Sequence, residues 1–498
     1  TVIDPASCDP LLEREYATTQ QWGTIITGTV TNDANGADGN PKTYSTITTG
    51  LGLLGIGTTW QNLQWPTTIA KGTPVTVKLG AEYSGVALGQ GVTVIGTKRD
   101  GLGNPIDIGT LQSVSGSLLN LLSGQNSFEY TFVPSDATGP KAYDGIRVQM
   151  GSVLSVAQNI NVYDAYYDKS VTQITCGQGD IEDVFFGVKE IGVGALTATV
   201  GVSNAWNIAD GDVATYATMF SGVGVLAAAQ LTTSFRTPSM VGDSLRIIIS
   251  KPGIVLNLNL LTGFNIQLYL GNTPVGAPIL NDSSLLTLKL LSGDTMAMTI
   301  LAPQTQPYDR VTISFGGVAS VLDQLRVHNI DRVTNTKVIG GDDDNNVTVC
   351  PGSTLTLQVP PANCSSYKWY NSPTGGNELA SGQTYTLPAT LAAGTYKYYI
   401  QPIRYGCAAL ERGEVTVVVR ATTPAAAIAN VTINGNNNTI VCTETGTVTL
   451  DAVLSNTPVL TNPVYHWYSF DGTTGQLIPG ETSATLSING LAPGTYTY

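Results

Sequence analysis

The sequence ADGNPKTYST at residues 37–46 returns as ADGDVATYAT at residues 209–218, 172 residues later. Between Val30 and Ile47, nine of the 18 positions are identical to the second copy without a gap. The retained residues are mostly Asn, Asp, Gly, Thr and Tyr rather than aliphatic residues, so the repeat preserves more than a packing pattern. Such internal similarity indicates two copies of one domain.

A second pair of segments extends this repeat. Residues 121–162 parallel residues 290–327, and Tyr143-Asp144 matches Tyr308-Asp309 at an offset of 165. An offset that drifts from 172 to 165 is expected where turns differ in length between homologous strands. The first 335 residues therefore predict two homologous domains, at residues 1–172 and 173–335.

Another repeat begins near residue 336. Residues 349–400 resemble residues 441–498, and Cys350, Trp369 and Tyr396 correspond to Cys442, Trp467 and Tyr496. A cysteine, a Trp about 19 residues later, a Tyr-bearing strand and then Cys407 follow the spacing of immunoglobulin-like sandwiches. We expect immunoglobulin-like domains at 336–421 and 422–498, the second incomplete because a final strand should follow Tyr498.

The composition predicts the fold class. The chain has 55 Gly and 25 Pro, and only 12% of its residues are charged. Its longer segments alternate Val, Ile, Leu and Tyr with Thr and Ser, which is typical of short strands joined by turns. We predict an all-β protein of tandem β-sandwiches: two homologous jelly-roll-like domains, then two immunoglobulin-like domains.

The charge and the hydropathy of the chain exclude several classes of protein. The net charge is −13, and the 23 basic residues are scattered, so the basic stripe of a nucleic-acid-binding protein is missing. No apolar run reaches the length of a membrane helix. The chain lacks an initial Met and a signal peptide, so we expect that a signal peptide has already been removed from an extracellular or outer-surface protein.

The repeated loop carries many oxygen donors. Calcium binds six to eight hard oxygens, which Asp, Asn and Thr side chains and turn carbonyls supply. The predicted metal ligands are equivalent in the two copies: Asp38, Asn40 and Thr43, and Asp210, Asp212 and Thr215. The alternative is a plain Asp-Gly turn in which the aspartate accepts hydrogen bonds from its own backbone.

Two tryptophans in TTWQNLQWP (58–66) are candidates for ligand binding. An exposed aromatic ring at the rim of a sandwich can stack on the C–H groups of a sugar, so Trp60 and Trp65 could contact a glycan. The alternative is that they are core or strand-end residues. The two histidines, His328 and His466, stand in no catalytic motif, and we expect the chain not to be an enzyme.

The calcium loop resembles that of discoidin-like, galactose-binding β-sandwiches, including carbohydrate-binding modules with the pattern A-x-DG-N-x-x-T-x-W. The resemblance covers about a dozen residues in each copy, and the Trp of the pattern is replaced in TYST and TYAT. It implies a calcium ion that stabilises loops near a glycan-binding face.

The C-terminal part resembles the immunoglobulin-like repeats of large Bacteroidetes surface proteins, which accompany gliding-motility adhesins and other cargo of the type IX secretion system. The resemblance rests on CPGSTLTL, YKWYNSPTGG, LAAGTYKYYI and RYGCAAL. It implies a disulfide between Cys350 and Cys407, export, anchoring to the cell surface and a C-terminal sorting domain. Cys364 is extra to the pattern, and Cys8 could pair with Cys176.

These observations predict a secreted modular adhesin with lectin-like sandwich heads on an immunoglobulin-like stalk. Its partner would be a glycan or another surface ligand. A structural subunit of an extracellular fibre, formed by self-association, is the alternative, because exposed strand edges recruit neighbouring chains. A polysaccharide-active enzyme is a third hypothesis, and it would require two facing carboxylates.

Overall fold

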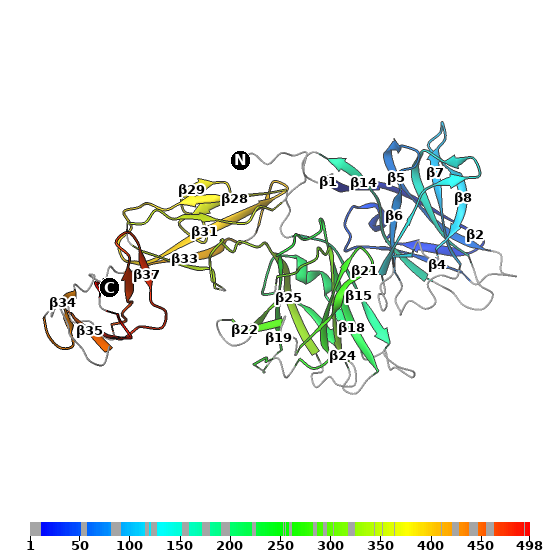
Figure 1. Cartoon of the computed structure of the whole chain (residues 1–498). Helices are drawn as coiled ribbons and strands as arrows, with labels where there is room; N and C mark the ends of the chain where they lie inside the picture. The colour runs from blue at the N-terminus through cyan, green and yellow to red at the C-terminus, as the bar shows by residue number, and fades with distance from the viewer. Residues whose placement is uncertain are drawn as a thin grey trace. The chain divides into compact units, whose positions relative to one another are not determined.

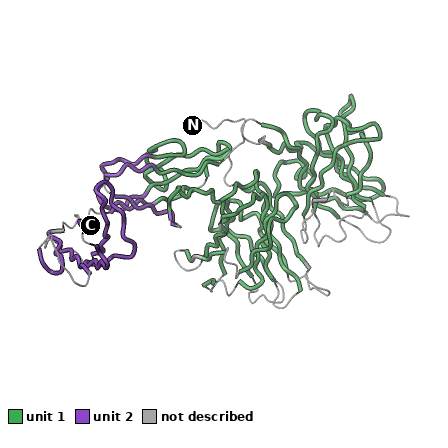
Figure 2. Tube along the Cα trace, in the orientation of Figure 1, with its two compact units in different colours: residues 1–341, 357–385, 398–415 green, residues 342–356, 386–397, 416–498 purple. Residues whose placement is uncertain are grey.

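The structure is a computed structural model (Figure 1). It describes residues 11–50, 57–80, 91–114, 119–120, 127–151, 159–171, 180–190, 200–221, 226–251, 253, 255–257, 261–281, 286–291, 296–301, 303–316, 324–342, 344–350, 352–362, 364–409, 411–420, 428–437, 447–454, 463–492 and 494–498. The chain divides into two compact units, coloured in Figure 2. One unit holds residues 1–341, 357–385 and 398–415, and the other holds 342–356, 386–397 and 416–498.

The first sandwich consists of two main antiparallel sheets. A seven-stranded sheet has the order β3-β4-β14-β6-β10-β9, with β1 paired to β14. A five-stranded sheet has the order β2-β5-β13-β7-β8. The elements are β1 (Leu11–Tyr16), β2 (Thr19–Ile25), β3 (Gly28–Thr31), the 3-10 helix η2 (Asp33–Ala37), β4 (Ser45–Thr49), β5 (Thr58–Ile69), β6 (Val75–Gly80), β7 (Val92–Arg99), β8 (Pro105–Ser113), β9 (Leu119–Asn120), β10 (Ser127–Phe132), the hairpin of β11 (Ser135–Asp136) and β12 (Gly139–Pro140), β13 (Tyr143–Gly151) and β14 (Asn159–Val171).

The second sandwich repeats these two strand orders, without counterparts of β1, β11 and β12 among the described residues. Its sheets have the orders β15-β18-β24-β20-β21 and β16-β17-β25-β19-β23-β22. The elements are β15 (Ile181–Glu190), β16 (Gly201–Ser203), the 3-10 helix η6 (Ala205–Ala209), β17 (Ala217–Phe220), β18 (Ala227–Phe235), β19 (Ser244–Ser250), β20 (Phe264–Leu270), β21 (Thr273–Leu280), β22 (Leu286–Leu290), β23 (Met296–Leu301), β24 (Arg310–Gly316) and β25 (Gln324–Val333).

Each sandwich has its own hydrophobic core. One cluster of buried side chains draws on residues 17–165 and the other on residues 184–330. The alternation along β4 (buried Ser45, Ile47 and Thr49 separated by half-buried residues) is that of a strand with one face toward the core. The all-β tandem-sandwich prediction is confirmed, whereas the four domain boundaries stay predictions.

The C-terminal residues form smaller antiparallel and mixed sheets. One sheet has the order β26-β33-β31-β28-β29, with β32 paired to β31, and β27 pairs with β30. Beyond them β34, β35 and β38 form a sheet, and β36 pairs with β37. The elements are β26 (Asn346–Val349), β27 (Thr356–Gln358), β28 (Ser365–Tyr370), β29 (Glu378–Ser381), β30 (Thr384–Thr386), β31 (Gly394–Arg404), β32 (Cys407–Ala408), β33 (Gly413–Val419), β34 (Ile428–Ile433), β35 (Thr447–Leu454), β36 (Tyr468–Phe470), β37 (Gly475–Leu477) and β38 (Thr485–Asn489).

The two tryptophans of the C-terminal repeat make the same kind of hydrogen bond. Trp369 and Trp467 are buried, and the indole N–H of each donates to a backbone carbonyl, of Gly382 at 3.0 Å and of Ser483 at 2.9 Å. Burying a Trp requires such a partner for its single donor. The shared arrangement explains why Trp returns at this position of the repeat.

Candidate functional site

The loop of the first repeat is held by its own side chains. Asn32, in the left-handed conformation at φ 51°, opens η2, and Gly39 follows Asp38 at φ 67°. One oxygen of Asp38 accepts the Asn40 N–H at 2.8 Å, and the other accepts the Thr43 hydroxyl at 2.8 Å. Asn and Gly tolerate positive φ, and Asp closes the turn, so these residue types follow from local geometry.

The loop of the second repeat has the same hydrogen bonds. Asn204 is left-handed at φ 53°, and the Asp210 carboxylate accepts the Asp212 N–H at 2.9 Å and the Thr215 hydroxyl at 2.6 Å. The structure therefore brings all six predicted metal ligands into two equivalent turns. These bonds are the ones that the plain-turn alternative requires, and they leave the calcium prediction open.

Two further oxygen-bearing side chains lie at equivalent places beside the loops. η2 packs on β14 and η6 packs on β25, and these strands carry Asp164 and Asn329, which are 165 residues apart. Both carboxylate oxygens of Asp164 and the amide oxygen of Asn329 are buried without a hydrogen-bond partner. A buried acceptor without a donor is costly, and a bound cation would satisfy both.

The pKa of Asp164 also indicates a cation site beside the loop of the first repeat. Burial, followed by the negative charge of Asp38, raises the pKa of Asp164 to about 8. Asp38, Thr43 and Asp164, together with turn carbonyls, fit the oxygen-only preference of calcium. The described residues contain no group of three or more His, Cys, Asp or Glu that could hold a metal, so Thr, Asn and backbone oxygens would have to complete such a site. The sequence contained the signal for Asp164 and Asn329, since both follow the matched pair Val162 and Val327 by two residues.

Trp65 does not contact solvent, and its prediction as a glycan-binding residue is wrong. The side chain is 1% exposed. Its indole N–H donates to the Glu15 carbonyl at 2.9 Å, and its ring packs edge-on against Tyr143 and Tyr167. Trp65 is a core residue because it shares the inward face of β5 with Leu63, which is fully buried.

Trp60 lies on the opposite, outward face of β5. Its neighbours Thr59 and Gln61 are fully buried, whereas Trp60 is half-buried. The ring lies across Gly23 on β2, where a Cβ would come within 2.6 Å of it, and the Arg147 guanidinium carbon is 4.6 Å from the ring centroid. Arg147 also forms an ion pair with Asp107 at 2.6 Å. An aromatic ring, a guanidinium and a carboxylate thus share this surface.

The predicted disulfide between Cys350 and Cys407 is wrong. Cys350 is free and exposed, whereas Cys364 and Cys407 are each disulfide-bonded. Ser365 pairs with Arg404 across β28 and β31, and Arg404 pairs with Cys407, so the register brings Cys364 close to Cys407. The sequence alone left Cys364 as the extra cysteine because strand register is not visible in spacing. Cys8, Cys176 and Cys442 lie outside the described residues.

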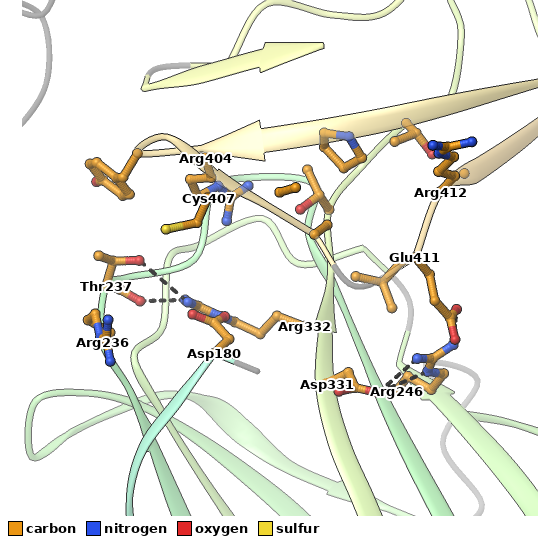
Figure 3. Close-up of a pocket in the computed structure, with 18 residues that line it drawn as sticks. Asp180, Arg236, Thr237, Arg246, Asp331, Arg332, Arg404, Cys407, Glu411 and Arg412 are labelled. Carbon is orange, nitrogen blue, oxygen red and sulfur yellow. Dashed lines mark hydrogen bonds and ion pairs between the residues drawn. The ribbon is translucent and has the colours of Figure 1, made fainter. Parts of the chain in front are cut away.

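A pocket of about 190 Å³ is lined by residues of β19, β25 and the β31–β33 region, together with Asp180 before β15 and with Arg236 and Thr237 after β18 (Figure 3). Arg404 forms a two-pronged ion pair with the buried Asp243 at 2.7 and 3.0 Å. Arg246 pairs with Asp331 at 2.8 Å and also with Glu411. In Figure 3 Arg332 points toward Asp180 and Thr237, its hydrogen-bond partners. Because each of these arginines is paired with a carboxylate, the pocket is bordered by ion pairs.

Comparison with known proteins finds a family match for one segment of the chain. Residues 342–420 match the model of the family described as Ig-like domain, CHU_C associated. No curated protein matches the chain. Among the helices of the described residues, none is long and apolar enough to cross a membrane.

Solved structures with some likeness are tandem modules and adhesin domains. The CBM32-1 and CBM32-2 domains of Clostridium perfringens ZmpB in complex with GalNAc align at 9% identity and a TM-score of 0.24, over 64% of this chain and 92% of that one. The CBM22-1-CBM22-2 tandem of Paenibacillus barcinonensis Xyn10C aligns at 11% identity and 0.19, over 66% and 98%. The adhesin domain of Epf from Streptococcus pyogenes aligns at 11% and 0.18, over 41% and 78%. At these TM-scores the likeness carries no argument about function.

Proposed function

We propose that this chain is a non-enzymatic carbohydrate-binding protein of a cell surface, an adhesin whose two sandwiches are the binding heads. The observation that carries the proposal is the outward face around Trp60. Sugar recognition combines an aromatic face for C–H groups with planar polar groups for hydroxyls, and Trp60 with Arg147 and Asp107 offers both. Trp65, buried in the core, takes no part.

The test is binding of the full 498-residue chain to a broad glycan array. We expect one sugar class to be retained, and Trp60→Ala to reduce its binding at least about ten-fold, the loss of a stacking contact worth about 1.4 kcal/mol. Trp22→Ala is the control, because Trp22 is an exposed tryptophan of the same sandwich and lies on the neighbouring strand β2. Absence of binding to every glycan would overturn the proposal.

Calcium is the proposed cofactor of the two repeated loops. The support is the three orphaned oxygens of Asp164 and Asn329 beside loops that already cluster Asp, Thr and carbonyl oxygens. Bound calcium would order the loops that carry it and would add no chemistry to glycan recognition itself. Repeating the array in a chelator separates the two roles, since we expect weaker but still specific binding without the cation.

A structural subunit of an extracellular fibre is the second candidate. Buried ion pairs such as Arg404–Asp243 favour it, because they hold successive parts of the chain in one geometry. Self-association would be seen as filaments by electron microscopy at rising protein concentration. Monomeric chains at all concentrations would exclude this candidate.

Export is proposed as well. The match to the CHU_C-associated Ig-like family over residues 342–420 supports placement on the outer cell surface, with the type IX secretion and surface-anchoring machinery as partners. Protease treatment of intact producing cells tests this placement, because only a surface protein is degraded. Protection of the chain until the cells are lysed would contradict it.

A further inference from the structure

The two sandwiches meet through a row of buried charges. Arg14 of the first sandwich contacts Asp183 at 3.2 Å and Glu182 at 3.4 Å, Lys78 pairs with Asp183, and Arg310 of the second sandwich lies 3.5 Å from Glu129. The side chains of all six residues are at most 19% exposed. Buried ion pairs are favourable only when their geometry is held closely, so this junction depends on how each charge is positioned.

Lys78 links the junction to the repeated loop of the first sandwich. Its ammonium group donates to Asp183, to the Val184 carbonyl at 3.4 Å and to the Pro41 carbonyl in the loop at 3.5 Å. The neighbouring loop residue, Lys42, places its ammonium group 5.4 Å from the ring of Trp206 in η6 of the second sandwich. The loop therefore touches the second sandwich directly.

Three carboxylates lie around Lys78. Glu129 and Asp164 are its cross-strand partners on either side, and Asp183 faces it from the second sandwich. Arg14 and Arg310 also face Glu129, Arg14 and Arg236 face Glu182, and Asp38 lies in the loop near Asp164. Asp164 is the carboxylate of this set without a hydrogen-bond partner. Without a further cation, Asp164 and Asp183 compete for the charge of Lys78.

The second sandwich lacks this arrangement. The row equivalent to Glu129, Lys78 and Asp164 is Met298, Ile248 and Asn329, paired in the same order across β23, β19 and β25. The loop residues equivalent to Pro41 and Lys42 are Val213 and Ala214. Around the second loop, Arg326 stacks on Tyr216 at 4.1 Å and His328 lies 2.8 Å from the Val213 carbonyl, so a cation there has no lysine–carboxylate pair to strengthen.

We propose that a divalent cation in the first loop, held by Asp38, Thr43 and Asp164, locks the first sandwich onto the second. The inference rests on the proposed calcium sites and adds a role for one of them. The cation satisfies Asp164 and Asp38, leaves Lys78 to Asp183, and fixes Pro41 and Lys42 against the second sandwich. Because such coupling is reciprocal, the junction in turn raises the calcium affinity of the first loop and leaves that of the second loop unchanged.

Hydrogen–deuterium exchange of the full chain tests the coupling, with calcium and with a chelator. Calcium should slow exchange in Ile181–Glu190, the second-sandwich strand at the junction, by about five-fold or more. Thr273–Leu280, on the edge strand β21, is the internal reference. The effect should disappear in Asp38→Asn and in Thr43→Val, and it should persist in Asp210→Asn, the matched change in the other loop.

Calorimetry separates failure of the coupling from failure of the sites. Asp183→Asn should weaken calcium binding at the first loop about five-fold or more, because Lys78 then competes with the cation for Asp164. Glu182→Gln, which removes a neighbouring junction carboxylate paired with Arg14, should not. Binding of two calcium ions without slower exchange at the junction would overturn the coupling and leave the sites standing. Loss of the slower exchange in Asp210→Asn would have the same meaning. No calcium binding at all would overturn the sites and the coupling together.

Discussion

Asp164 on β14 is the cross-strand partner of Lys78 on β6, and it is a buried carboxylate without a hydrogen bond. In the second sandwich the same two positions hold Asn329 and Ile248. Both repeats thus have the same loop, but these two strand positions are charged only in the first sandwich. The repeats therefore share the loop and differ in the charges next to it.

The metal-free protein should lose stability as pH rises. Burial and Asp38 raise the pKa of Asp164 to about 8 in the folded chain, above its unfolded value of 3.8. The folded state then holds the proton more tightly, so its contribution is present at low pH and is lost between about pH 4 and pH 8, at up to about 1.4 kcal/mol per pH unit. Denaturant unfolding in a chelator measures this slope.

Asp164→Asn should remove most of that slope, and Asn329→Asp should introduce a similar one into the second sandwich, where the wild-type side chain does not titrate. Calcium should flatten the wild-type slope because the cation replaces the proton on Asp164. A chelator-independent slope would contradict this account.

Calcium binding should have a stoichiometry of two. Asp38→Asn and Asp210→Asn should each abolish one site, since each removes the only carboxylate that its loop shares with the other repeat. Titration calorimetry measures the number of sites. Asp100→Asn is the control: Asp100 also closes a tight turn, accepting the N–H groups of Leu102 and Asn104 at 2.8 Å, yet it has no part in either proposed site.

Cys364 and Cys407 should prove to be bonded to each other. Cys407→Ser should destabilise the chain by about 2–5 kcal/mol, and Cys364→Ser combined with it should cost little more, because either change opens the same bridge. Cys350→Ser should leave stability unchanged. Mass spectrometry of non-reduced peptides identifies the pair, and a peptide that links Cys350 to Cys407 would contradict the structure.

The two tryptophans of β5 should behave in opposite ways. Trp65→Ala should cost about 3–5 kcal/mol of unfolding free energy, because it empties a core site and orphans the Glu15 carbonyl. Trp60→Ala should cost about 1 kcal/mol, mainly the contact with Arg147. Thermal unfolding measures both, and a larger loss from Trp60→Ala would assign it to the core.

Much of the fold was predictable because it depends on short-range patterns. Alternating apolar residues, punctuated by Gly and Asn, specify strands and turns without reference to distant residues. The internal repeats then predicted two equivalent sandwiches, and the structure has matching strand orders in both. The Asn, Asp, Gly and Thr of the repeated loop are likewise explained by hydrogen bonds within a dozen residues.

The predictions that were wrong depended on strand register. Trp60 and Trp65 are both in β5, and the sequence does not indicate which one faces the core, since a shift of one residue in register exchanges the faces. The choice between Cys350 and Cys364 as the disulfide partner also depended on register, between β28 and β31. Neither can be resolved from spacing along the chain.

The sequence by itself determined the strand-rich class, the two repeats and the local chemistry of their loops, because each follows from residues close together in the chain. Only the tertiary structure decided that Asp164 and Asn329 stand beside those loops, that Trp65 is buried, and that Lys78 meets Asp183 across the junction. These relationships join residues more than 100 positions apart or depend on strand register, and they arise only when the sheets pack.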